Sequence, residues 1–149
     1  MQLGKRTFLV FLLGNVTILA IVVCLAGYYY VQCQNYNALI KQYEAVTIRA
    51  NLCINYGNGT VLWYNETILP VGCNLLNATK RVAVVNSTYY PTYEASFVNA
   101  INGVCYNSTH YWMWLRWDEN ENDWKYGSVG ADLYILKPDE TLMWRYEKG

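Results

Sequence analysis

The fold is decided where the chain reads TIRANLCI, residues 47–54. Every second residue from Ile48 to Ile54 is apolar, and most of the residues between them are polar. A period of two is typical of a β-strand with one buried face. The Asn58-Gly59 pair that follows is the strongest short signal for a hairpin turn. We therefore expect Val61 to Ile68 to form the returning strand.

Downstream of this hairpin the pattern continues as short strands around one short helix. The predicted elements are a helix at 74–81, a loop at 89–91, turns at 102–103 and 118–123, and strands at 96–101, 111–117 and 141–146. Asn74 is placed to cap the helix, because an Asn side chain accepts a hydrogen bond from a free N–H of the first turn. One short helix among strands predicts an α+β fold.

Upstream of the strands, the 25 residues from Thr7 to Val31 carry no charged side chain. At about 1.5 Å per residue the run is about 37 Å long, enough to cross a hydrocarbon core of about 30 Å. Lys5 and Arg6 just before it place the N-terminus in the cytoplasm by the positive-inside rule. We therefore predict a single-pass protein of the cell membrane, with its C-terminal domain extracellular and Met1 retained. The alternative is a signal peptide cleaved before Gly27.

The helical pattern continues beyond the membrane. Apolar residues recur at three- and four-residue steps, at Tyr36, Leu39, Ile40 and Tyr43. We expect one continuous helix about 60 Å long, whose apolar face packs on the domain or on another subunit. This divides the chain into an anchor and stalk at 1–46 and an extracellular domain at 47–149.

Small and polar residues gather in the membrane helix. The candidates for helix packing are Asn15, Thr17, Ala20, Cys24 and Gly27. Small side chains let helices approach closely, and the Asn15 amide would lack hydrogen-bond partners in hydrocarbon. These residues predict other protein subunits, in an oligomer or a hetero-complex. A lone anchor that tolerates small residues is the equal alternative.

The acceptor pattern for N-glycosylation, Asn-x-Ser/Thr, recurs after the membrane helix. It occurs at Asn58, Asn65, Asn77, Asn86 and Asn107. Five matches exceed what chance placement gives in a chain of this composition, so we predict a glycosylated domain. Accidental matches in an Asn- and Thr-rich sequence are the alternative.

Four of the five cysteines, Cys33, Cys53, Cys73 and Cys105, follow the membrane helix. Four cysteines allow three pairings, and an extracellular location favours disulfides. We predict a bond between Cys73 and Cys105, which lie at the entry of the short helix and just beyond a strand. The chain has no Cys-x-x-Cys pair and a single histidine, so neither a metal site nor a cofactor is predicted.

Charged residues are scarce, at 15% of the chain, and the formal net charge is zero. A nucleic-acid-binding protein would show a basic patch, and none is present in this sequence. The 15 Tyr and 6 Trp residues, with Asn and glycan, supply a polarity that changes little with pH because these groups do not titrate near pH 4. Such a surface suits an archaeon from an acidic or hot habitat.

Several segments, taken in order, resemble one known family. They are INYGNGT at 54–60, LLNA at 75–78, FVNAINGV at 97–104, YWMW at 111–114, WKY at 124–126, VGAD at 129–132 and LKPDETLMWRY at 136–146. The chain resembles the small domain at the C-terminus of transcobalamin, which also occurs in bacterial and archaeal surface proteins. The resemblance implies a β-grasp-like mixed sheet around one helix, and a corrinoid ligand whose other half-site lies on a helical domain. Pro138, where the family has a glycine, and the added cysteines depart from the pattern.

Few residues stand out as candidates for chemistry. His110 has no nucleophile or carboxylate partner that spacing can assign. The acidic run at 118–123 lacks the residue order of a calcium loop and is interpreted as a solvated hairpin tip. Trp112 and Trp114 share one face of an aromatic strand. They are candidates for a small-ligand platform, although packing in the core or on a subunit is the favoured interpretation.

Two functions of different classes fit these observations. The first is a non-catalytic, glycosylated surface protein that serves as a structural or accessory subunit of a membrane complex or surface filament. The second is an extracellular module that binds a corrinoid-like small molecule. The expected partners are the membrane and other subunits through the N-terminal helix, not nucleic acid, and no enzyme activity is predicted.

Overall fold

The computed structural model describes residues 2–149. Met1 and the side chains of Gln2, Leu3 and Lys5 lie outside the described part, and so does the expected retention of Met1. The chain separates into two compact units, Met1–Ala45 and Val46–Gly149.

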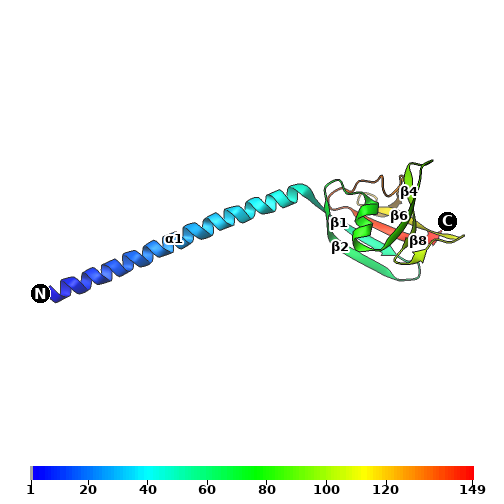
Figure 1. Cartoon of the computed structure of the whole chain (residues 1–149). Coiled ribbons are helices and arrows are strands. Elements are labelled where there is room, and N and C mark those ends of the chain that lie inside the picture. The colour runs from blue at the N-terminus through cyan, green and yellow to red at the C-terminus, as the bar shows by residue number, and fades with distance from the viewer. Residues whose placement is uncertain (1) are drawn as a thin grey trace. The chain divides into compact units, whose positions relative to one another are not determined.

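The first unit is formed by one helix, α1 (Gln2–Val46), which Figure 1 shows as an uninterrupted coil. Its 45 residues rise about 68 Å at 1.5 Å each. The stretch Arg6–Val46 is long and apolar enough to cross a membrane: its most apolar window has a mean hydropathy of 2.8, and none of that window is buried. The expected continuation of the helix beyond the apolar run, to Val46, is confirmed.

The second unit is built of strands and one short helix. They are β1 (Thr47–Asn55), β2 (Val61–Pro70), α2 (Leu75–Val82), β3 (Val85–Tyr90), β4 (Ala95–Ile101), β5 (Val104–Cys105), β6 (His110–Asp118), β7 (Asp123–Tyr126) and β8 (Thr141–Lys148). The larger sheet has the order β2-β1-β8-β6-β7, and β3, β4 and β5 form a second, smaller sheet.

The larger sheet is mixed. β1 runs parallel to β8, with Leu52 opposite Leu142, and the other neighbouring pairs are antiparallel. A parallel pair cannot be joined by a tight turn, so the chain must cross over between the two strands, and α2 lies in that connection. A mixed sheet with one short helix on its core side is the α+β, β-grasp-like fold that we expected.

The predicted hairpin between β1 and β2 is present. Its turn is closed by a hydrogen bond from Tyr56 N to Thr60 O, at 3.0 Å. Gly57 adopts φ +70°, and a Cβ at this position would lie 2.4 Å from Tyr146 O. A residue with a side chain would therefore be strained and would also collide with β8.

α2 covers the buried face of the larger sheet. Asn74 caps it as predicted, because its Oδ1 accepts from Asn77 N at 2.8 Å. Thr79, only 1% exposed, donates to Leu75 O and accepts from Trp144 Nε1, both at 2.7 Å. The core between helix and sheet includes Ile48, Ala50, Leu52, Ile54, Leu69, Leu75, Leu76, Ala78, Leu142 and Trp144. Each fully buried Leu or Ile side chain contributes about 1.5–3 kcal/mol to folding.

The smaller sheet differs from the prediction. The loop expected at 89–91 is wrong for Tyr89 and Tyr90, because β3 runs to Tyr90 and pairs with β4. β3 and β5 were not predicted as strands, and neither was β7 of the larger sheet. Strands of two and four residues are too short to show a period, and their extended form depends on pairing with strands elsewhere in the chain.

Candidate functional site

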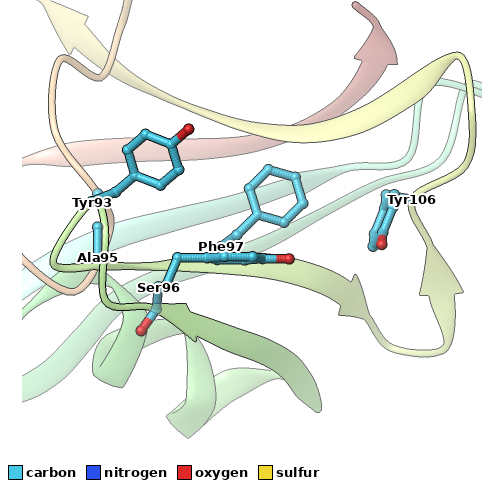
Figure 2. A pocket seen from close by; sticks show the side chains of 7 residues that line it. Tyr93, Ala95, Ser96, Phe97 and Tyr106 are labelled. Atoms are coloured by element: carbon cyan, nitrogen blue, oxygen red, sulfur yellow. The ribbon is translucent and has the colours of Figure 1, made fainter.

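An open hollow of about 420 Å³ lies where β4 begins. Its lining is Tyr90, Tyr93, Ala95, Ser96, Phe97, Tyr106 and Gly130, and we call it the aromatic hollow. Figure 2 shows the rings of Tyr93, Phe97 and Tyr106 set around it. Its volume falls within the range of small-molecule sites, and such sites are also mostly apolar.

The turn between β3 and β4 positions two of the rings. Tyr93 N donates to Tyr90 O at 3.1 Å, and Glu94 N donates to Pro91 O at 3.3 Å. Pro91 restricts the backbone of the turn, and Glu94 adopts the left-handed region with φ 48°. This geometry leaves Tyr93 77% exposed. A ring so exposed contributes little to the packing of the core.

The carboxylate of Asp132, a half-buried residue, lies close to Gly130 in the lining of the hollow. At Gly130, a Cβ would be 2.8 Å from Ala95 Cβ and 2.7 Å from Asp132 Oδ1. The other oxygen, Asp132 Oδ2, accepts from Ser96 N at 2.7 Å, and the main-chain oxygen of Asp132 accepts from Asn74 Nδ2 at 2.9 Å. These bonds tie the loop to β4 and α2. Asp132 Oδ1 itself is buried and has no hydrogen-bond partner among the described residues.

The far wall of the hollow is a cluster of rings. Phe97 and Tyr106 meet edge to face, with centroids 5.6 Å apart, and Tyr106 stacks on Tyr111 at 6.2 Å. Tyr106 N also donates to Asn99 O at 2.8 Å. Edge-to-face and stacked pairs are favourable arrangements for aromatic rings, so this wall is held in place without a ligand.

The two tryptophans predicted as a possible platform lie in the core. Trp112 and Trp114 are 3% and 8% exposed, and their indole N–H groups donate to Val104 O at 2.8 Å and Val129 O at 2.9 Å. Both rings are largely covered, but they also line a small hollow of about 190 Å³ together with Gly127 and Val129, so their role as a ligand platform stays a prediction. Packing in the core, the favoured interpretation, is what the structure shows.

The residues that line the hollow were not predicted from the sequence. A usable signal was present: between 90 and 106 the chain has four aromatic residues and one acidic residue, but no basic one. Their convergence depends on the β3–β4 pairing and on a loop about 30 residues further along the chain, neither of which local patterns reveal.

His110 takes part in a surface turn. Its Nδ1 lies 2.9 Å from Thr109 Oγ1 and its ring stacks on Tyr146 at 5.5 Å. Asn107 Oδ1 accepts from the backbone N–H groups of both Thr109 and His110. Within residues 2–149, no three His, Cys, Asp or Glu side chains are grouped so that they could hold a metal ion.

The acidic run at 118–123 lies at the β6–β7 hairpin. Asp118 Oδ1 accepts from Asn120 N at 3.0 Å, and Glu121 pairs with Lys125. Asp118 and Glu121 are thus engaged in local contacts of the hairpin.

The five glycosylation candidates are all exposed: Asn58, Asn65, Asn77, Asn86 and Asn107. They lie on the β1–β2 turn, on β2, on α2, on β3 and in the loop before β6. Exposure permits modification, and occupancy stays a prediction.

The predicted disulfide is not formed. Cys73 and Cys105 are free thiols, as are the other three cysteines. The Cys73 thiol is buried beside α2 and contacts Asn74 O at 3.4 Å, whereas Cys105 is exposed on β5, with Gly103 O at 3.8 Å. Each sulfur atom is thus directed to a carbonyl oxygen of its own segment.

The helix-packing candidates Asn15, Thr17, Ala20, Cys24 and Gly27 are exposed along α1. Asn15 Nδ2 donates to Phe11 O, and Thr17 Oγ1 donates to Gly14 O, both at 2.8 Å. Main-chain oxygens of α1 therefore accept hydrogen bonds from the Asn15 and Thr17 side chains. The Asn15 amide, which we took as a sign of a neighbouring helix, has a partner within α1. Association through this stripe stays a prediction.

No protein-family model and no curated protein matches the chain by sequence. Among solved structures, the chain is similar to haptocorrin in complex with Cbi, with a TM-score of 0.58 and 18% identity over 68% of this chain. The match covers 25% of the haptocorrin chain, so this chain corresponds to about a quarter of that protein.

A second similar structure is a protein from Ruminococcus gnavus whose name suggests metal binding. It has a TM-score of 0.48 and 9% identity, over 68% of this chain and 98% of that one. The likeness to haptocorrin shows a shared fold, in agreement with the fold implied by the transcobalamin resemblance.

Proposed function

We propose that this chain is a non-catalytic, single-pass membrane protein that presents a small-molecule-binding module outside the cell, with the aromatic hollow as its ligand site. The observation that carries the proposal is the exposure of the rings around the hollow: Tyr90, Tyr93 and Tyr106 are 43%, 77% and 44% exposed. Burying apolar surface stabilises a complex by about 25 cal/mol per Å². A ligand that binds among these rings would bury their exposed apolar surface, and this burial would stabilise the complex.

The placement of the module outside the cell is supported by α1 and by the surface. α1 contains one stretch able to span a membrane, and basic residues precede it, which favours a cytoplasmic N-terminus. All five glycosylation candidates lie on the surface of the unit that follows, where a glycosylation enzyme could reach them. Glycosylation of these sites and an archaeal source in an acidic or hot habitat belong to this proposal.

A corrinoid is the ligand implied by the transcobalamin resemblance. The similar structure of haptocorrin, a binding protein, is a complex with Cbi, which supports ligand binding as the class of function. Because this chain matches only a quarter of haptocorrin, a corrinoid would need a second half-site from another chain.

A role as a structural or accessory subunit is the second candidate. Beyond the membrane stretch, the stalk side chains Tyr36, Leu39 and Tyr43 are 64%, 63% and 52% exposed. An exposed apolar face of this kind favours packing against another protein. The two roles are compatible if the partner subunit completes the ligand site.

Native mass spectrometry tests both candidate functions, ligand binding and a subunit role. The full chain is extracted in mild detergent from the membranes of the cells that produce it. We expect a small molecule to be retained by the wild type and by Tyr89→Ala, and lost from Tyr93→Ala. Tyr89 is a matched control because it is 56% exposed and does not line the hollow. Extraction of a chain with no ligand but with bound protein subunits would favour the second candidate instead.

A further inference from the structure

We propose that the aromatic hollow recognises an organic cation, with a tertiary or quaternary ammonium group held among its rings. This inference rests on the proposed function, since it names the chemical class of the ligand for the same site. Three features of the site carry it: the rings, the sign of the nearby charge and an unused carboxylate oxygen.

The first feature is the ring lining. Tyr90, Tyr93, Phe97 and Tyr106 supply four π systems around a volume of about 420 Å³. The face of an aromatic ring is negative, and it attracts a cation placed within about 6 Å of the ring centroid. A cage of several rings is the usual protein site for a methylated ammonium group. Such a group is weakly hydrated, so it loses little hydration free energy when it leaves water.

The second feature is the sign of the charge. Between Arg81 and His110 the sequence contains one charged residue, Glu94, and between Tyr126 and Lys137 it contains one, Asp132. The segments that line the hollow therefore carry acidic side chains and no basic ones. This pattern attracts a cation and repels an anionic ligand.

The third feature is the carboxylate of Asp132, which lies close to Gly130. Asp132 Oδ1 lacks a hydrogen-bond partner among the described residues, and a buried polar atom without a hydrogen bond destabilises the folded state. This oxygen lies next to Gly130, which lines the hollow, since a Cβ at Gly130 would be 2.7 Å from it. A cation above Gly130 would offset that cost through its charge, without direct contact.

The test compares choline with its neutral isostere 3,3-dimethyl-1-butanol, in which carbon replaces the nitrogen. The full chain is held in a maltoside detergent, which has no ammonium group, and the ring-¹³C tyrosine signals are followed by NMR. We expect choline to shift the Tyr93 and Tyr106 signals with a Kd about tenfold lower than that of the isostere. Short-chain phosphatidylcholine forms a second arm, which separates recognition of a lipid headgroup from recognition of a free cation.

Two variants separate charge from shape. Asp132→Asn retains an acceptor for Ser96 N and removes the negative charge, so it should weaken choline binding several-fold and leave the isostere unchanged. Tyr93→Leu retains apolar contact but removes a π face, and should act in the same direction. Because Tyr93 lies outside the core, this second variant folds even if Asp132→Asn does not.

The outcomes are distinguishable. An isostere that binds as well as choline, or a preference for choline that survives both variants, overturns the cation inference and leaves the hollow as a site for neutral ligands. If neither compound moves the signals of the hollow, the cation inference fails. If native mass spectrometry also finds no ligand, the proposed function fails with it.

Discussion

Two groups of aromatic side chains in the same domain have opposite environments. The core indoles are Trp112, Trp114 and Trp144, and the hollow tyrosines are Tyr90, Tyr93 and Tyr106. The core indoles are at most 8% exposed, and each indole N–H donates to an acceptor inside the domain. The hollow tyrosines are at least 43% exposed and stand around an open volume.

This difference shows which aromatic residues build the fold and which are available for recognition. A buried indole whose N–H already donates inside the domain has little further surface to bury against a ligand. A tyrosine with a solvent-exposed ring still has apolar surface that a ligand can bury. Here Tyr90, Tyr93 and Tyr106 lie around one hollow, together with Gly130. The two groups should therefore respond differently to mutation.

The largest expected effect is on stability. Trp112→Ala should lower the free energy of unfolding by about 3–5 kcal/mol, because it leaves a cavity in the core. Tyr93→Ala should change it by less than about 0.5 kcal/mol, as surface substitutions do. Chemical denaturation of the full chain in detergent measures both. Equal losses of unfolding free energy in the two variants would contradict the distinction between the core indoles and the hollow tyrosines.

A smaller effect is expected at the floor of the hollow. Gly130→Ala places a Cβ within 3 Å of both Asp132 Oδ1 and Ala95 Cβ, so we expect a loss of about 1–3 kcal/mol from overpacking together with weaker ligand binding. Thermal unfolding and a ligand titration check the two effects. Unchanged binding in this variant would show that the ligand lies elsewhere.

A pH effect on stability is expected at Tyr134, which packs against the core. Burial, and then the hydrogen bond that Tyr134 donates to Glu140 Oε1 at 2.7 Å, raise the pKa of Tyr134 to about 12. The stability that this hydroxyl contributes is complete below pH 10, the ordinary pKa of tyrosine, and is lost as the pH rises through about 12. Denaturation curves between pH 9 and 12 should show this decline in the wild type, and Tyr134→Phe should reduce its slope.

The cysteines provide the smallest test. Burial raises the pKa of Cys53 to about 11, and the thiolate is the reactive form. At pH 8 we expect iodoacetamide to modify the exposed Cys105 about 100-fold faster than Cys53. Peptide mapping of alkylated protein gives both rates, and a Cys105 that resists alkylation until a reductant is added would indicate a disulfide in the native protein.

Much of the fold could be predicted because it depends on sequence patterns that extend over only a few residues. The alternation at 47–54, the Asn58-Gly59 turn and the Asn74 cap each act over a few residues, and each is present in the structure. The apolar run in α1 is similarly local. The pairing of β3 with β4 was missed, because Tyr89 and Tyr90 precede a proline and read as a loop without their partner strand.

The binding site was not predictable in the same way. On sequence alone, Trp112 and Trp114 were better platform candidates than Tyr93, because a strand with aromatic residues on both faces does not reveal which face is covered. The difference is set by α2 and by the loop that carries Val129 and Gly130. Both reach their positions through long-range hydrogen bonds, from Leu76 N to Ala131 O and from Trp114 Nε1 to Val129 O.

The most direct test of the account is a tyrosine footprint of the native protein. Nitration rates are measured on the full chain in its own membrane, and again after exhaustive detergent exchange to remove bound small molecules. We expect Tyr90, Tyr93 and Tyr106 to react faster after exchange, whereas Tyr89 and Tyr126, each 56% exposed, should react equally in both samples. Equal rates for all five tyrosines before and after exchange would contradict the claim that the aromatic hollow is a ligand site.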